Sequence, residues 1–269
     1  MSAVGTFIAL GDSFTEGMSD ELRPDGRYLG WADRVSTRLA MSEPGLRYAN
    51  LAVRGKLLDE VVVEQLLPAR ELVTDPAHTL VSFHAGPNDV LRPGVDLRSV
   101  AARYDRAVRL LHDTGAEVLL FTVVPRAGGT GRTANRLADR FGRFNDAVRE
   151  SAARYDATLA DQARVVALHD RRLWDPDRLH LAPEGHRRVA ALVLDVLGHG
   201  DTGASSRWWE EPLPPTAPAG RVQALAADAH WLRYHLVPWV GRRIRRVSSG
   251  DGVRPKNPDL QVVSRPSQR

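Results

Sequence analysis

The stretch TFIALGDSFTEG, residues 6–17, joins a short apolar run to a polar turn. The run at residues 7–10 is bounded by turn residues, which is typical of a buried strand in a parallel sheet. The tripeptide Gly11-Asp-Ser follows at its carboxyl end, and parallel sheets carry their ligand chemistry at that edge. This one stretch therefore predicts both the fold class and the position of a site.

Short apolar runs alternate with amphipathic segments over the first two hundred residues. Further runs at residues 48–53, 79–83 and 118–124 predict strands. Apolar residues at spacings of three and four predict helices over residues 58–66, 97–111, 137–148 and 189–196. Alternation of this kind predicts an α/β fold, an open parallel β-sheet with helices on both faces and right-handed crossovers.

The composition is that of a folded protein and excludes several kinds of site. Of the 269 residues, 43% are hydrophobic and 26% charged, enough to bury a large core. The sequence contains no cysteine, which excludes disulfides, iron–sulfur clusters, thiolate zinc sites and a cysteine nucleophile. The first residues lack the basic stretch of a signal peptide, and no apolar run reaches the roughly 20 residues that span a bilayer, so we expect a cytoplasmic protein.

The character of the sequence changes near residue 200. We expect a main domain over residues 1–200, a proline-rich linker or strap over 201–220, an amphipathic helix over 221–247 and a flexible basic tail over 248–269. The net charge is +4, and the residues from 241 onward contribute +6, so the basic character lies in the tail. Because nearly all the cations are arginine throughout the chain, a base-composition bias explains them more simply than nucleic-acid binding, and we expect no specific nucleic-acid partner.

The expected C-terminal helix has an apolar seam. Its members are Val222, Leu225, Ala229, Leu232 and Leu236, flanked by Trp231 and Trp239 and followed by Arg242, Arg243, Arg245 and Arg246. An amphipathic helix usually buries its stripe against its own protein, which is the interpretation that we favour. The alternative is peripheral contact with an anionic membrane, with tryptophans at the interface and arginines at the headgroups.

Ser13 is the candidate nucleophile of the chain. A serine at the tip of a buried strand is held rigidly, with its hydroxyl at the binding edge of the sheet. The alternative is that Asp12 or Ser13 only caps the following helix, which is the more common role of an isolated triplet. The other motifs must therefore decide between the two interpretations.

A second motif, WDPDRLHL at residues 174–181, pairs carboxylates with a histidine. Asp177 lies three residues before His180 and can reach around one turn to hold the imidazole, fixing its tautomer and stabilising its charged form. Asp175 competes for this orienting role. In the structural alternative, Asp177 is a helix cap and His180 an ordinary surface residue.

Two more motifs, NLAVRG at residues 50–55 and GPND at residues 86–89, end the second and third expected strands. Gly55 can present its backbone N–H without obstruction, and the amide of Asn88 can donate to a developing negative oxygen, together with the N–H of Ser13. Each motif alone is more often a turn. Their order and their position at strand ends favour one shared site.

The four motifs GDSFTEG, NLAVRG, GPND and DRLHL resemble, in this order, the four blocks of the SGNH/GDSL hydrolases, over about residues 5–198. The resemblance implies a flavodoxin-like three-layer sandwich, with the C-terminal helical extension outside it. It also implies that Ser13 is the nucleophile, that His180 is the general base oriented by Asp177, and that Ser13, Gly55 and Asn88 form the oxyanion hole. It implies no cofactor and no metal.

By the same resemblance, we expect a serine esterase that acts on a small-molecule ester through an acyl-enzyme intermediate. Two alternatives stay open: an acyltransferase with the same triad, and a noncatalytic binding protein whose basic tail holds an anionic partner. The filled catalytic positions disfavour the binding protein. The acyl group, the alcohol and the oligomeric state are not determined by the sequence.

Overall fold

Six strands form the central sheet of the computed structural model, which describes residues 3–125, 132–202, 206–216, 220–238, 241 and 248–265, without the side chains of residues 133, 221–225 and 236. The strands are β1 (Thr6–Gly11), β2 (Arg47–Asn50), β3 (Thr79–His84), β4 (Glu117–Phe121), β5 (Thr158–Ala160) and β6 (Asn257–Val262). Their order is β5-β4-β3-β1-β2-β6, and all pairs are parallel except β2 with β6. The predicted α/β fold with a parallel sheet is confirmed.

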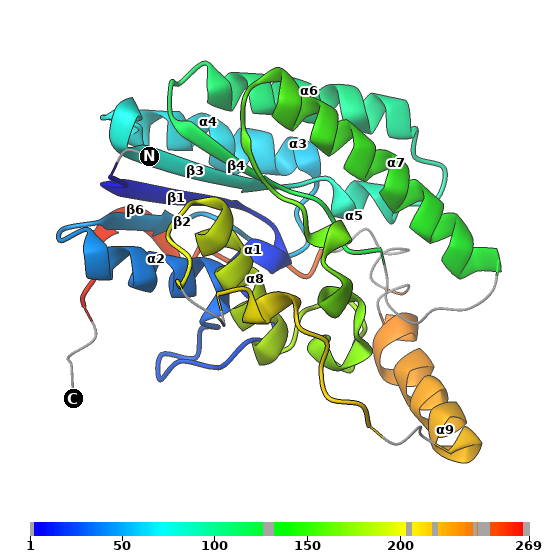
Figure 1. Cartoon of the computed structure of the whole chain (residues 1–269). Coiled ribbons are helices and arrows are strands. Elements are labelled where there is room, and N and C mark those ends of the chain that lie inside the picture. Colours follow the sequence, from blue (N-terminus) through cyan, green and yellow to red (C-terminus); the bar gives the residue numbers. More distant parts are fainter. Residues whose placement is uncertain are drawn as a thin grey trace.

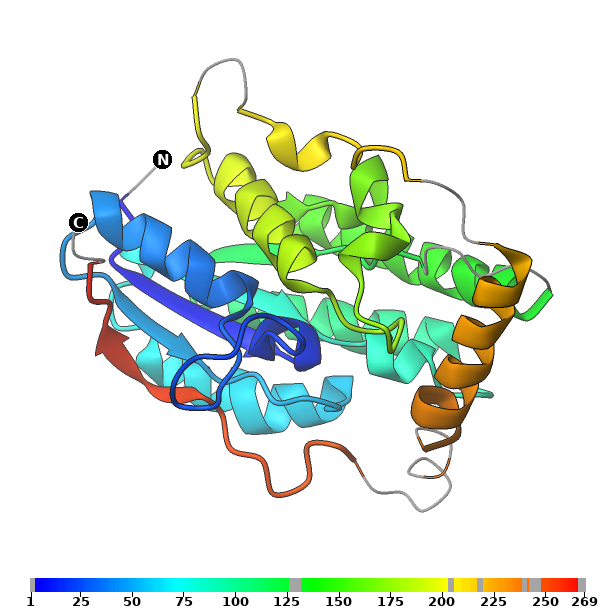
Figure 2. The same ribbon diagram turned by 90° about the horizontal axis from the view of Figure 1, so that it is seen from below.

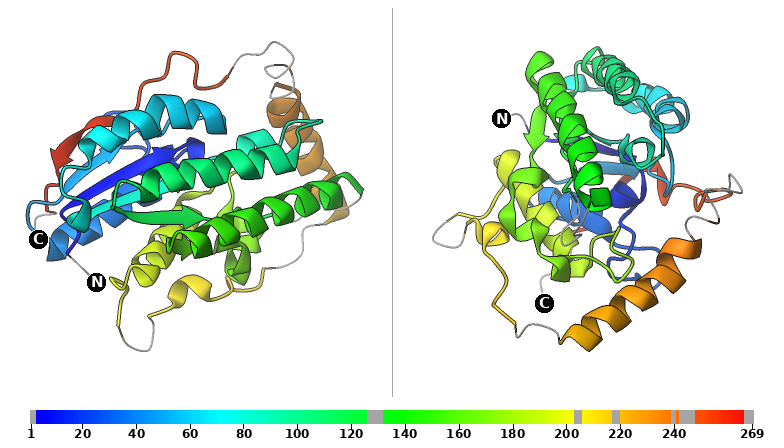
Figure 3. Two further views of the ribbon diagram at one scale, coloured as in Figure 1. Left: turned by 90° about the horizontal axis from the view of Figure 1, so that it is seen from above. Right: turned by 90° about the vertical axis from the view of Figure 1, so that its right-hand side faces the viewer.

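Helices cover both faces of this sheet (Figure 1). The α-helices are α1 (Ser13–Glu16), α2 (Gly30–Ser42), α3 (Leu58–Val61), α4 (Leu67–Ala69), α5 (Pro87–Val90), α6 (Leu97–His112), α7 (Arg132–Arg154), α8 (Pro183–Val196) and α9 (Arg221–Trp231). A π-helical turn at Val62–Leu66 joins α3 to α4, and another at Leu232–Leu236 extends α9. Helices α2 and α8 pack on one face, whereas α3, α4, α6 and α7 pack on the other (Figures 1 and 3).

Strand β1 contributes to two cores because alternate side chains of a strand point to opposite faces. Phe7 and Ala9 pack with α2 and α8, whereas Ile8 and Leu10 pack with α3, α6 and α7. Strand β2 lies on one side of β1 and β3 on the other, so the chain reverses the direction in which it adds strands at β1. In sheets of this kind, ligands bind beside the carboxyl ends of the strands at this switch point.

The expectation of a flexible tail over residues 248–269 is wrong for residues 257–262. These residues form β6, which pairs antiparallel with β2 from Arg47 opposite Val262 to Asn50 opposite Asn257. Pairing satisfies the backbone groups that an exposed edge strand would otherwise present to solvent. Figure 2 shows the segment after residue 248, in orange-red, approaching this edge of the sheet. Residues 266–269 lie outside the described part of the chain.

Helix α9 lies beside the carboxyl ends of the strands and apart from the two helical layers (Figures 1 and 3). The expectation that its seam packs on the protein itself is wrong for Ala229 and Leu232, which are exposed, the latter at 50%. The side chains of the other seam residues, and Trp239 and the four arginines that follow it, lie outside the described residues. Among the helices of the described segments, none combines the length and apolar composition that crossing a bilayer requires.

The described part of the expected linker, residues 206–216, lies against the main domain. Trp209 is only 2% exposed and belongs to the core beneath α8. Arg188 donates hydrogen bonds to the carbonyls of Trp209 and Glu211, and Arg172 donates to those of Leu213 and Pro214. These contacts are those of a strap rather than of a free linker.

Candidate active site

Ser13 is half-buried and begins the short helix α1 directly after β1. Asp12 caps this helix, because its carboxylate accepts a hydrogen bond from the backbone N–H of Phe14 at 3.1 Å. The buried side chain of Gln65 holds the strand end, accepting from the N–H of Gly11 at 2.8 Å and donating to its carbonyl at 2.9 Å. Asp12 therefore takes the capping role, which leaves the side chain of Ser13 at the end of the strand.

The loop that carries the histidine is a closed turn between Trp174 and Leu181, which form an isolated antiparallel bridge. His180 directs Nδ1 at Asp177 Oδ2 at 2.5 Å, and Asp177 Oδ1 accepts from the N–H groups of Leu179 and His180 at 2.7 and 3.0 Å. Asp175 instead accepts from the N–H of Asp177 at 3.0 Å. Of the two competing carboxylates, Asp177 is thus the one whose side chain contacts the imidazole.

Electrostatics favour an ionised carboxylate at Asp177. Burial by itself raises the pKa of Asp177, but the hydrogen bonds and positive charge of His180 outweigh this effect and lower the pKa to about 2. A carboxylate facing Nδ1 makes this nitrogen the donor, so Nε2 of the neutral ring is the nitrogen that can accept a proton. The pair has the arrangement that a general base requires.

Two of the three expected oxyanion donors, Gly55 and Asn88, lie on separate segments that contact each other. Asn88, in α5, donates from Nδ2 to Asp12 Oδ2 at 3.1 Å and to the carbonyl of Lys56 at 3.0 Å. Gly55 precedes Lys56 and has a φ of +75°, a left-handed conformation that favours glycine. Both amide hydrogens of Asn88 are therefore engaged, and donation to a substrate requires that one of them be shared.

A cavity of about 100 Å³ brings most of these groups together at the carboxyl end of the sheet. Ser13, Asn88 and His180 line it, with Asp177 behind the imidazole, whereas Gly55 is not among the lining residues. The rest of the lining is mainly apolar and includes Phe14, Leu91, Val123, Val124, Phe141, Trp174 and Leu181. The arrangement can hold an uncharged group beside a hydroxyl and a histidine.

Two lining histidines are absent from the sequence-based set of site residues. His84, the last residue of β3, packs against Phe14 with tilted rings whose centroids are 4.3 Å apart, and its Nδ1 lies 3.3 Å from Asp12 Oδ1. His186 is fully buried at the start of α8, and its Nε2 lies 3.0 Å from the carbonyl of Met18. Burial lowers the pKa of His186 to about 4, so this ring is neutral near pH 7. The position of His84 directly after a predicted strand could have indicated that it lies at the site. No feature of the sequence gave the same indication for His186.

Helix α9 contacts the histidine loop directly. Trp231 donates from Nε1 to the carbonyl of Asp177 at 2.8 Å, and the guanidinium of Arg178 lies 4.8 Å from the centroid of the Trp231 ring. Arg178 also forms an ion pair with Asp228. The C-terminal extension is thus joined to the loop between Asp177 and His180 through residues outside the apolar seam.

The described residues contain no group of three or more histidine, aspartate or glutamate side chains placed to hold a metal ion. The histidines at the cavity contact carboxylate, carbonyl or aromatic groups instead.

Comparison with known proteins relates the chain to one family. The family described as the GDSL-like Lipase/Acylhydrolase family matches residues 9–188. No curated protein sequence matches the chain.

Solved structures share the fold at low sequence identity. LAE5, an α/β-hydrolase enzyme from the metagenome of Lake Arreo in Spain, is 20% identical with a TM-score of 0.60, covering 74% of this chain and 97% of its own. TesA is 20% identical with a TM-score of 0.57, covering 71% and 97%. Axe2, an acetylxylan esterase from Geobacillus stearothermophilus, is 20% identical with a TM-score of 0.54, covering 74% and 97%.

Proposed function

The chain belongs to the GDSL-like Lipase/Acylhydrolase family and is an SGNH/GDSL-type hydrolase, and from this premise we propose that it is a serine esterase with Ser13 as nucleophile. The observation that carries the proposal is the cavity shared by Ser13, Asn88 and His180, with the imidazole held by Asp177 at 2.5 Å. These are the side-chain types that two-step acyl transfer needs.

In the first step, Ser13 Oγ attacks the ester carbonyl carbon while His180 Nε2 takes the hydroxyl proton. Asp177 stabilises the imidazolium, because its carboxylate stays ionised and accepts from Nδ1. The C–O bond of the ester breaks, and the departing alcohol takes the proton from His180. An acyl-Ser13 intermediate remains.

In the second step, water attacks the acyl carbonyl and gives a proton to His180, which returns it to Ser13 as the acid leaves. The N–H of Ser13 and one shared hydrogen of Asn88 stabilise the tetrahedral oxyanion in both steps, and the N–H of Gly55, which does not line the cavity, is the third donor that the family resemblance implies. Asn88 is suited to this because Asp12 and Lys56 already fix its amide at the cavity. An alcohol in place of water would make the same residues an acyltransferase.

The mainly apolar lining supports an ester with an uncharged acyl group as substrate. The test is a chain-length series of chromogenic esters, from acetyl to dodecanoyl, with the wild type and Ser13→Ala side by side and with products separated. We expect hydrolysis by the wild type and none by the variant. Equal turnover by the two proteins would overturn the proposal, and acyl transfer to an added alcohol in preference to water would identify the acyltransferase.

The exposed side chains of α9 and its extension support peripheral contact with a lipid surface as part of the proposal. Leu232 is 50% exposed, Tyr234 58% and Val237 59%, and Arg233 beside them is exposed as well. Apolar and cationic side chains together favour the interface of an anionic bilayer. The proposal places the cavity, which α9 adjoins through Trp231, near a lipid ester.

A further inference from the structure

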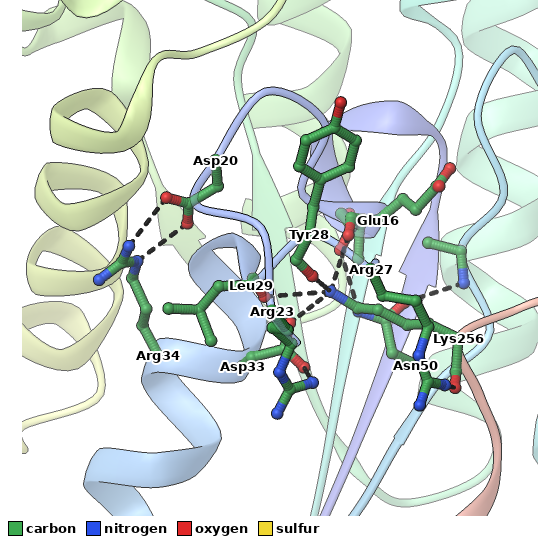
Figure 4. A network of polar contacts seen from close by, with 12 residues as sticks. Glu16, Asp20, Arg23, Arg27, Tyr28, Leu29, Asp33, Arg34, Asn50 and Lys256 are labelled. Carbon is green, nitrogen blue, oxygen red and sulfur yellow. Dashed lines mark hydrogen bonds and ion pairs between the residues drawn. The ribbon is translucent and has the colours of Figure 1, made fainter. Parts of the chain in front are cut away.

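Lys256 is a buried lysine that lies far beyond the family match at residues 9–188. It is 6% exposed, in the segment that leads into β6. Its ammonium donates to the carbonyls of Glu16, Tyr28 and Leu29 at 2.7, 3.1 and 3.1 Å (Figure 4). It also forms an ion pair with the buried carboxylate of Asp33.

These acceptors belong to two turns that contact each other, and one of these turns ends the helix that Ser13 begins. Glu16 is the last residue of α1, the helix that Ser13 begins, and Tyr28 and Leu29 precede α2. The two turns touch backbone to backbone, because a Cβ on Gly17 would collide with the backbone of Gly30. Hydrogen bonds from one ammonium to both turns therefore fix the end of α1 relative to the start of α2.

The same contact reaches the loop that carries Gly55. The carboxylate of Glu16 accepts from the backbone N–H of Arg54 at 2.7 Å and forms an ion pair with the Arg54 side chain. On the other side of this loop, a Cβ on Gly55 would lie 2.5 Å from Ser248 Oγ and 2.9 Å from Ser249 Oγ. The C-terminal segment thus packs against the Gly55 loop at residues 248–249 and holds α1 at Lys256.

Chemistry explains why a lysine occupies this position. An ammonium has rotatable hydrogens that can follow acceptors in several directions, whereas a guanidinium presents a planar fork. Burial lowers the pKa of Lys256, and the adjacent carboxylate of Asp33 opposes this effect. A buried charge is costly without partners, and the carbonyls and the carboxylate supply them.

We propose that Lys256 is a positioning residue for the proposed ester hydrolysis: it holds Ser13 through α1 and the Gly55 loop through Glu16, so that the C-terminal segment completes an active site whose motifs all lie within residues 9–188. The inference rests on the proposed function. Lys256 does not line the cavity and touches no reacting group. Its effect is on the geometry of the nucleophile and of the oxyanion donor, and so on kcat rather than on KM.

The test compares Lys256→Met with Arg188→Met as the matched control. Arg188 is also a buried cation that pairs with a carboxylate and donates to two backbone carbonyls, but it holds the strap at Trp209 and not the Ser13 turn. We expect Lys256→Met to lower kcat and the rate of fluorophosphonate labelling at least tenfold, with KM within threefold. At an equal loss of thermal stability, Arg188→Met should keep kcat within threefold.

A double variant, Lys256→Met with Asp33→Asn, guards against simple misfolding. It removes the buried carboxylate that Lys256→Met leaves with Arg23, at 4.0 Å, as its cationic partner, so it should recover thermal stability relative to Lys256→Met while kcat stays low, because three carbonyls still lack their donor. A folded variant of either kind with kcat within twofold of wild type would overturn the inference, as would an equal loss of kcat in Arg188→Met. Ester hydrolysis by the Ser13→Ala variant at the wild-type rate would instead refute the proposed function itself.

Discussion

Replacement of Asp177 by asparagine tests the orientation of the base with a minimal change of shape. The carboxylate accepts from His180 Nδ1 at 2.5 Å and from two backbone N–H groups. Asparagine can keep the backbone contacts, but it can present an NH₂ group to Nδ1. The imidazole then favours the tautomer with hydrogen on Nε2, which cannot accept the proton of Ser13.

Two magnitudes follow from this geometry. Loss of the correct tautomer costs about 10³-fold to 10⁴-fold in kcat, less than the loss of Ser13 or His180. The pKa of Asp177 is lowered from 3.8 to about 2, a difference that corresponds to about 2 kcal/mol of unfolding free energy. Because the folded-state pKa is the lower one, this stability is present above about pH 4 and is lost as the pH falls toward 2.

Initial rates on a short-chain chromogenic ester and urea unfolding at several pH values measure both quantities. Wild type and Asp177→Asn should differ by about 2 kcal/mol at pH 7 and converge toward pH 2. Asp175→Asn is the control, since Asp175 contacts the N–H of Asp177 rather than the imidazole, and it should cost less than tenfold in kcat. A larger rate loss in Asp175→Asn, or a loss below tenfold in Asp177→Asn, would refute the assignment.

Three further results are expected. The pKa of His186 is about 4 in the folded protein and near 6.5 in the unfolded chain, so unfolding free energy should fall by about 3 kcal/mol more between pH 7 and pH 4 in wild type than in His186→Gln; parallel urea titrations would contradict this. Asn88→Ala should lower kcat by about 10²-fold to 10³-fold because one oxyanion donor is lost, and an unchanged kcat in a folded variant would exclude that role. The protein should sediment with anionic phospholipid vesicles at low salt, and Leu232→Ser with Val237→Ser should weaken this; no binding by the wild type would end the lipid proposal.

The parts of the fold that sequence could predict are those with a local signal. Each of the four predicted strands is an apolar run, and Ser13 and Asn88 lie in the short turns that follow two of them. Asp177 and His180 are three residues apart, so their contact needs only one turn of chain. Helix α2 could also have been predicted, since Trp31, Val35 and Leu39 recur every four residues, but it is not among the helices predicted from the sequence.

Contacts across long stretches of chain could not be predicted in this way. Lys256 meets Glu16 across 240 residues, and a single lysine in a polar segment has no periodicity that points to burial. Strand β6 pairs through backbone hydrogen bonds, its side chains are mostly exposed, and Pro258 argues against a central strand. Gln65 holds the end of β1 and lies on a predicted helix. The spacing of apolar residues predicts that helix, but it does not predict that Gln65 contacts Gly11.

Covalent labelling of Ser13 is the most direct measurement of the central claim. The full-length protein is treated with a fluorophosphonate, digested and analysed by mass spectrometry, while ester hydrolysis is followed in parallel. We predict one phosphonyl adduct, on the peptide containing Ser13, formed at the rate at which activity disappears, and neither labelling nor hydrolysis in a folded Ser13→Ala variant. Wild-type hydrolysis by Ser13→Ala, or inactivation with the adduct on a different residue, would contradict the account.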